Sequence, residues 1–132
     1  EKMAEMIVSG FSKEGVPAKP FHLRKWHRSE IMTEVFDAKA VVVGSPTLNN
    51  SLYPSLADFL MYMKGLKPLN KIGAAFGSYG WSGEAVKMIN KELEVMKFDV
   101  VDPGMRVQYI PDKEALEACY EFGRMIGKAV KG

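Results

Sequence analysis

This chain of 132 residues has one cysteine and a formal charge of only +2. The single Cys119 excludes an internal disulfide and a cysteine-based zinc site. Its place in a helical apolar pattern predicts a buried structural thiol. The 18 Lys and Arg residues are scattered among 16 acidic residues without a basic tract, so no nucleic-acid partner is expected.

Long apolar runs are also lacking. No stretch approaches the roughly 18 apolar residues of a membrane span, and the charged amino end is not typical of a signal peptide. We therefore expect no membrane association and a cytoplasmic location. The length of 132 residues predicts a single domain, 1–132, with one core of ordinary size.

Helical and strand patterns alternate along the chain. Strands are expected at 19–26 (half-buried or edge), from Ala40, from Ile72, and at 98–109 (interrupted by a turn, or an edge strand). Helices are expected from the first residues, from Ser29 as N-cap to Asp37, from Pro54 to a stop at Gly65, from Ser82 as N-cap, and from Asp112 as N-cap. This order predicts an α/β protein with a doubly wound parallel sheet. An opening strand is lacking, so we expect a fragment without its first strand and loop.

Two loops follow the buried strands. Gly44 ends an apolar run, and Gly77 ends the next one, 33 positions later. That spacing is typical of one strand-helix-strand unit, which places both loops on the same carboxyl edge of a parallel sheet. The first loop is Ser45, Pro46, Thr47, Leu48, Asn49 and Asn50; the second is Ser78, Tyr79, Gly80, Trp81, Ser82 and Gly83.

The two loops differ in chemistry. The first offers hydroxyl and amide groups that can bind a sugar-like chain or the polar edge of a heterocycle. Its plainer interpretation is a capped turn that leads into the next helix. The second holds Tyr79 and Trp81, whose rings can stack on a flat ligand. Its plainer interpretation is that Trp81 packs under the loop or against a partner domain.

Other motifs are missing. The glycines at 77, 80 and 83 do not form the dinucleotide fingerprint, and no Gly-Lys-Ser or Gly-Lys-Thr phosphate loop occurs. His22 and His27 are poorly spaced for a shared metal. No nucleophile, base and orienting residue form a recognisable set, so we expect neither a catalytic residue nor a metal site in this chain.

Both loops carry a resemblance. The residues at 42–50, Pro54, the residues at 77–83 and the helix that begins at Glu84 resemble the flavodoxin-like domain of flavodiiron proteins, also called A-type flavoproteins. The resemblance implies a flavodoxin-like three-layer sandwich that binds FMN. It implies that Thr47, Asn49 and Asn50 lie beside the flavin and ribityl chain, and that Tyr79 and Trp81 flank the ring.

The same resemblance implies a function. In that family the flavin passes electrons to a two-iron domain that reduces oxygen or nitric oxide. This chain would be the electron relay, with a diiron domain, a rubredoxin-like protein or a reduced-flavin donor as partner. The near-neutral surface suggests a fixed partner domain or a homodimer mate. Two alternatives stay open: a flavin-free regulatory or interaction domain that uses Trp26 and Trp81, and a stand-alone FMN-dependent quinone reductase.

Overall fold

The computed structural model describes residues 2–23, 25–44, 54–68, 71–79, 84–100, 105–108 and 113–131. From α2 onward, helices and strands alternate through these residues as the sequence pattern predicts, except that two short strands follow α4. The helices are α1 (Lys2–Lys13), α2 (Arg28–Asp37), α3 (Pro54–Leu66), α4 (Glu84–Val95) and α5 (Lys113–Lys131). The strands are β1 (Ala40–Gly44), β2 (Ile72–Tyr79), β3 (Asp99–Val100) and β4 (Met105–Gln108).

The described strands form one parallel sheet with β2 at its centre. β1 pairs with one side of β2 from Ala40↔Ile72 to Gly44↔Phe76. β3 and β4 both pair with β2, β3 at its start and β4 at its end. β3 and β4 confirm that the segment expected as an interrupted or edge strand forms strand structure, and the turn expected at 102–104 lies outside the described residues.

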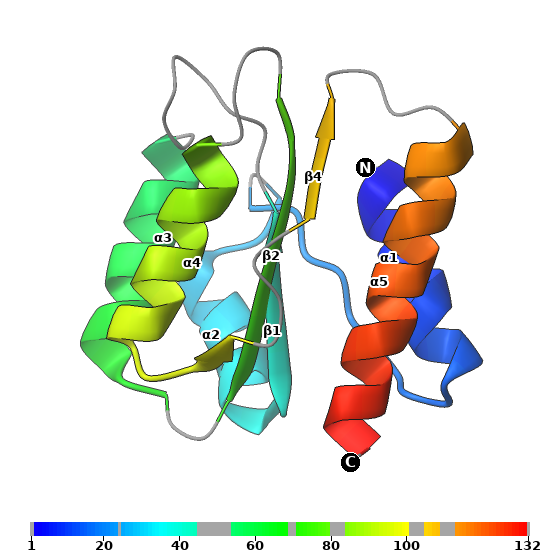
Figure 1. Ribbon diagram of the computed structural model, residues 1–132. Coiled ribbons are helices and arrows are strands. Elements are labelled where there is room, and N and C mark those ends of the chain that lie inside the picture. The colour runs from blue at the N-terminus through cyan, green and yellow to red at the C-terminus, as the bar shows by residue number, and fades with distance from the viewer. Residues whose placement is uncertain are drawn as a thin grey trace.

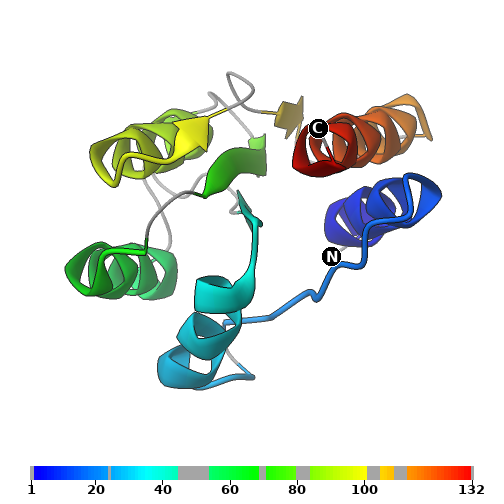
Figure 2. The same cartoon turned by 90° about the horizontal axis from the view of Figure 1, so that it is seen from below.

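Helices cover both faces of the sheet, which gives three layers. α1 and α5 lie on one face, and α2, α3 and α4 lie on the other (Figures 1 and 2). A hydrophobic core lies on each face of the sheet, and successive strand residues point to opposite faces. Val42 and Ala74 face α1 and α5, whereas Val43 and Ala75 face the other three helices. The expected doubly wound, flavodoxin-like sandwich is confirmed.

The α3 and α4 stripes are buried as their spacing predicts. In α3 the stripe is Leu56, Phe59, Leu60 and Met63, and at α4 it is Val86, Ile89, Leu93 and Met96. In α5, Cys119, Gly123 and Ile126 are buried, whereas Leu116 and Tyr120 are half-buried. The prediction of a buried structural thiol is confirmed, since Cys119 has no exposed surface.

The strand expected at 19–26 was wrong. The described residues of this segment, 19–23 and 25–26, form no strand, and a turn closes from Lys25 N–H to the His22 carbonyl at 2.9 Å. Phe21 and Leu23 still pack against the core, as their apolar character predicts. A strand needs a pairing partner as well as a suitable pattern, and no described strand pairs with this segment.

Two helix ends also differ from expectation. α2 is capped by His27, whose Nδ1 accepts a hydrogen bond from the Ser29 N–H at 3.1 Å, so Ser29 lies inside the helix and is not its cap. α3 continues past Gly65 to Leu66, and Lys67 then takes a left-handed φ of 53°. The left-handed backbone at Lys67 therefore ends α3. Gly65 does not end the helix, since its φ is not positive.

β1 is less buried than its run of apolar residues predicts. Only Val43 is buried; Ala40, Val41 and Val42 are half-buried. The reason is that β1 lies at the border of the described sheet and pairs with β2 alone among the described strands. A strand at the border of a sheet can have helices over both faces and still lack a neighbouring strand along one side. Its residues are therefore more exposed than those of a central strand.

α1 and α5 approach each other closely through two glycines. A Cβ on Gly10 would lie 2.1 Å from the Tyr120 carbonyl oxygen, and a Cβ on Gly123 would lie 2.1 Å from the Ile7 carbonyl oxygen. Side chains larger than hydrogen do not fit at such distances. The two helices can therefore share one core only because both positions are glycine.

Candidate functional site

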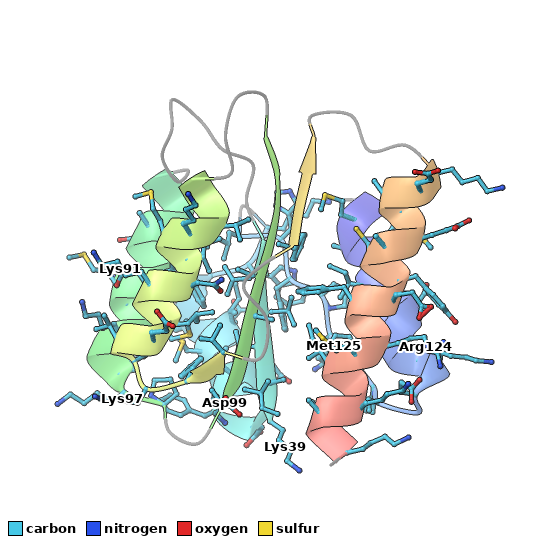
Figure 3. All side chains as sticks on the ribbon, in the orientation of Figure 1. Lys39, Lys91, Lys97, Asp99, Arg124 and Met125 are labelled. Carbon is cyan, nitrogen blue, oxygen red and sulfur yellow. The ribbon has the colours of Figure 1, made fainter. Side chains whose placement is uncertain are left out.

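The candidate site is the carboxyl edge of the sheet, where β1, β2 and β4 end. Gly44 closes β1 opposite Phe76, and Tyr79 closes β2 opposite Gln108. The carboxyl ends of β1 and β2 therefore both point toward this edge, in the upper part of Figure 1. Lys39 and Asp99, at the amino end of the sheet, lie at the opposite side of the molecule in Figure 3.

Most of the predicted site residues lie outside the described residues. These are Ser45, Pro46, Thr47, Leu48, Asn49 and Asn50 of the first loop and Gly80, Trp81, Ser82 and Gly83 of the second. Their placement around a ligand stays a prediction. What the structure provides is the strand end from which each loop starts.

Ser78 and Tyr79 differ from expectation. They were expected in the loop, but they are the last two residues of β2 and pair with Val107 and Gln108 of β4. Pairing with β4 holds the chain extended beyond the point where local sequence favours a turn. Glycine, serine and tyrosine at 77–79 carry no local signal for this extension.

The carboxyl edge is stepped as a result. β1 pairs with β2 only as far as Phe76, whereas β2 runs on for Gly77, Ser78 and Tyr79. Three strand residues at roughly 3.3 Å each place the end of β2 about 10 Å beyond Gly44, the last described residue of β1. A flat ligand beside the end of β1 could thus rest against the extended end of β2.

Phe76 and Gly44 form a close pair at the foot of this step. A Cβ on Gly44 would lie 2.1 Å from Phe76 Cζ and 2.5 Å from both Cε atoms, so the ring tip lies directly on the glycine. Sequence analysis missed this pair. It depends on the register between two strands 33 positions apart, which no local pattern reveals.

A cluster of ionic contacts holds the end of α1 against α5. Glu14, after α1, accepts a hydrogen bond from Arg124 Nε at 2.9 Å, and Lys131 lies 3.7 Å from its other oxygen. The hydrogen bond from Arg124 holds the pKa of the Glu14 carboxyl below its usual value. Arg124 lies on α5, well below the loops in Figure 3.

Lys71 is a buried cation with a structural role. Its Nζ donates to the Phe36 carbonyl at 2.9 Å and also to the Ala38 carbonyl, and the residue is 8% exposed. Both acceptors lie at the carboxyl end of α2, where carbonyl groups lack helical partners. Lys71 therefore ties the end of α2 to the start of β2.

Two other candidate groups have structural explanations. Burial raises the pKa of the Cys119 thiol, which disfavours the reactive thiolate. His27 caps α2 through the contact with Ser29 described above. Within the described ranges, His, Cys, Asp and Glu side chains form no group of three that could hold a metal ion.

A shallow cleft lies between the 19–26 segment and α2. Its lining includes the exposed Trp26, 46% accessible, whose ring meets Phe21 edge-on at 5.3 Å. One rim is an ion pair between Lys19 and Glu34 at 3.1 Å. The remaining lining residues are Pro20, Glu30 and Thr33. This cleft is the best support among the described residues for the protein-contact alternative.

None of the helices within the described residues has both the length and the apolar character needed to cross a membrane.

Comparison with solved structures defines the class of fold. The chain superposes on rubredoxin oxygen:oxidoreductase from Desulfovibrio gigas with a TM-score of 0.95 and 42% identity, covering 98% of this chain and 32% of that one. The flavodiiron protein from Giardia intestinalis gives a TM-score of 0.93 and 33% identity, with 98% and 32% covered. The resemblance to the flavodoxin-like domain of flavodiiron proteins is confirmed.

Sequence comparison gives the family. A family model described as Flavodoxin matches residues 1–123, so the chain belongs to the flavodoxin family. A nitric oxide reductase from Moorella thermoacetica is 41% identical over 131 residues, which cover 98% of this chain and 33% of that protein. The chain thus spans about a third of the length of these three relatives.

The stepped edge fits the cofactor of this family. Membership of the flavodoxin family supports FMN, the cofactor that the sequence predicts. A flat ring needs a planar support and polar groups at its edge, and the loops after β1 and β2 contain both kinds of side chain. Gly44, exposed at the end of β1, adds no side chain to this edge.

Proposed function

We propose that this chain is an FMN-binding electron-transfer domain that relays electrons through its flavin to a partner redox centre. The observation that carries the proposal is the stepped carboxyl edge, where the loops that begin at residues 45 and 80 leave adjacent strands. FMN supplies the redox chemistry when bound, and the protein determines its position, solvent access and potential. The absence of an acid-base set in the sequence agrees with that role.

The proposed roles of the residues follow the two loops. Thr47, Asn49 and Asn50 would hydrogen-bond the polar edge of the flavin and its ribityl chain. Tyr79 and Trp81 would flank the ring, with Tyr79 held at the end of β2 by its pairing with Gln108. The remaining positions of the two loops would complete the binding site through main-chain groups.

The wider reaction is proposed from the relatives. Their names describe a nitric oxide reductase and a rubredoxin oxygen:oxidoreductase. By analogy, the partner of this chain would be a diiron domain that reduces oxygen or nitric oxide, and the donor a rubredoxin-like protein or a reduced flavin. We also propose a cytoplasmic location, and a homodimer mate as a further partner.

The test is cofactor content and affinity in the protein as its gene encodes it. We expect a yellow protein with about one FMN per chain, and we expect Trp81→Ala to weaken FMN binding about tenfold or more through lost stacking. Trp26→Ala is the matched control, because Trp26 lies in the cleft beside α2. A colourless protein that ignores added FMN would refute the proposal.

The second candidate is a flavin-free interaction domain, which the exposed Trp26 favours. A partner that docks on the cleft would bury this indole and lose affinity in Trp26→Ala. If Trp26→Ala abolishes partner binding while FMN never binds, the second candidate replaces the first. Isothermal titration with FMN and with the partner separates the two.

A further inference from the structure

The contact between Phe76 and Gly44 closes the ladder between β1 and β2. Gly44↔Phe76 is the last pair of this ladder, and residue 45 begins the first loop directly after it. The ring tip occupies the space where a side chain at 44 would stand, since a Cβ there would be 2.1 Å from Cζ. Only glycine at 44 permits this arrangement.

The ring connects the core to the loop. Phe76 is half-buried and packs against the core between the sheet, α1 and α5, whereas Gly44 is exposed. Toward the amino end of the strands, the same face of the sheet carries Val42 beside Ala74. The base of the ring is therefore held by the core, and its tip covers the last strand residue before the loop.

Such a contact restricts the backbone at the strand end. A glycine without packing could leave a strand in many directions, because it has the widest choice of φ and ψ. The Phe76 ring lying on Gly44 excludes those φ and ψ values of Gly44 that would bring the chain into contact with the ring. Pro46 then limits the next step, because proline fixes its own φ and disfavours helical backbone at Ser45.

We propose that Phe76 is a positioning residue for the flavin site: its ring on Gly44 restricts the backbone at the end of β1, from which the chain continues into the first loop. The inference rests on the proposed function, because it assigns to that loop the polar contacts with FMN. Phe76 itself need not touch the cofactor. It acts through Gly44 and the chain that follows.

The alternative is that Phe76 only fills the core. In that case changes at 44 and 76 would alter folding stability but would leave FMN affinity unchanged. The two explanations separate in a double-mutant cycle, because Gly44→Ala clashes with the ring when it is made alone and Phe76→Leu removes the atoms that it meets. Gly44→Ala adds a methyl group where the ring lies, and Phe76→Leu removes the outer part of the ring.

The experiment measures FMN dissociation constants by fluorescence quenching, with the visible spectrum of bound FMN as a second readout. We expect Gly44→Ala to weaken binding about tenfold and Phe76→Leu to weaken it about threefold. We expect the double variant to bind within about threefold of wild type, because the shorter leucine side chain leaves room for the added methyl group. Thermal unfolding of each apoprotein records the structural effect separately.

Gly65→Ala is the matched control. No atom lies within 4 Å of a Cβ at this position, so the same substitution adds a methyl group in open space. FMN affinity should match wild type. If Gly44→Ala fails to fold, Phe76→Leu still decides, because it adds no atom: an unchanged dissociation constant and spectrum would overturn the proposal.

The two failures are distinguishable. A wild-type protein that does not bind FMN refutes the proposed function and the positioning role together. A wild-type protein that binds FMN, with effects at 44 and 76 that simply add in the double variant, overturns the positioning role alone.

Discussion

The glycine contacts between α1 and α5 lead to a quantitative prediction for Gly123→Ala. A Cβ at 123 would lie 2.1 Å from the Ile7 carbonyl oxygen and 2.9 Å from its carbonyl carbon, where ordinary contact begins at 3.4 Å. The obstacle is backbone, so no side chain can rotate away. The helices would have to separate by roughly 1 Å, which loosens a core packed to crystal-like density.

The expected cost combines two opposing effects. Alanine favours an isolated helix over glycine by about 1 kcal/mol. Overpacking a core costs about 1–3 kcal/mol, and we take the upper end because backbone meets backbone. The net loss in free energy of unfolding is therefore about 2 kcal/mol, or a fall in Tm of about 6–10 °C for a domain of this size.

Urea denaturation followed by circular dichroism measures this loss, with Gly65→Ala as control. The control position is in α3 and open to solvent, so helix propensity alone predicts a gain of up to about 1 kcal/mol. Equal stability of Gly123→Ala and wild type would refute the reasoning. A gain like that of Gly65→Ala would show that the helices do not meet at Gly123.

Three further predictions concern other parts of the molecule. Lys71→Met should lower the free energy of unfolding by about 2–3 kcal/mol, because two carbonyls at the end of α2 lose their donor; Lys39→Met, an exposed neighbour, should be neutral in the same urea assay. Arg124→Met should move the midpoint of acid unfolding to higher pH. Arg124 lowers the pKa of Glu14, so the ion pair stabilises the fold above the usual carboxyl pKa and this stabilisation is lost as pH falls. An unchanged acid midpoint would contradict this. If FMN binds as proposed, the uncharged residues of the two loops should disfavour negative charge on the reduced cofactor. A redox titration should then give a two-electron potential below that of free FMN. A higher potential would count against this role of the loops.

The sequence predicts the parts of this fold that depend on local periodicity. The buried stripe of α3, from Leu56 to Met63, repeats at helical spacing and packs as expected. The apolar residues on either side of the turn signal at 102–104 correctly predict strand structure, which is found in β3 and β4. These features need only neighbouring residues, so a single sequence contains them.

The features that were missed depend on distant partners. The 19–26 segment has a strand pattern but no described partner, and β2 is longer than expected because β4 pairs with its end. The end of α3 at Lys67 requires a left-handed backbone that lysine rarely adopts, so its sequence gives no warning.

For the candidate site, sequence spacing correctly predicts one shared edge for the two strand ends. The contact between Phe76 and Gly44 requires knowledge of the register, and the side chains of the first loop, such as Thr47 and Asn49, remain predictions.

The central place of β2 has a consequence for how the protein opens. Each of the other three described strands hydrogen-bonds to β2, and its Ala74 and Ala75 have no exposed surface. The amides of β2 should therefore exchange with deuterium only when the whole domain unfolds.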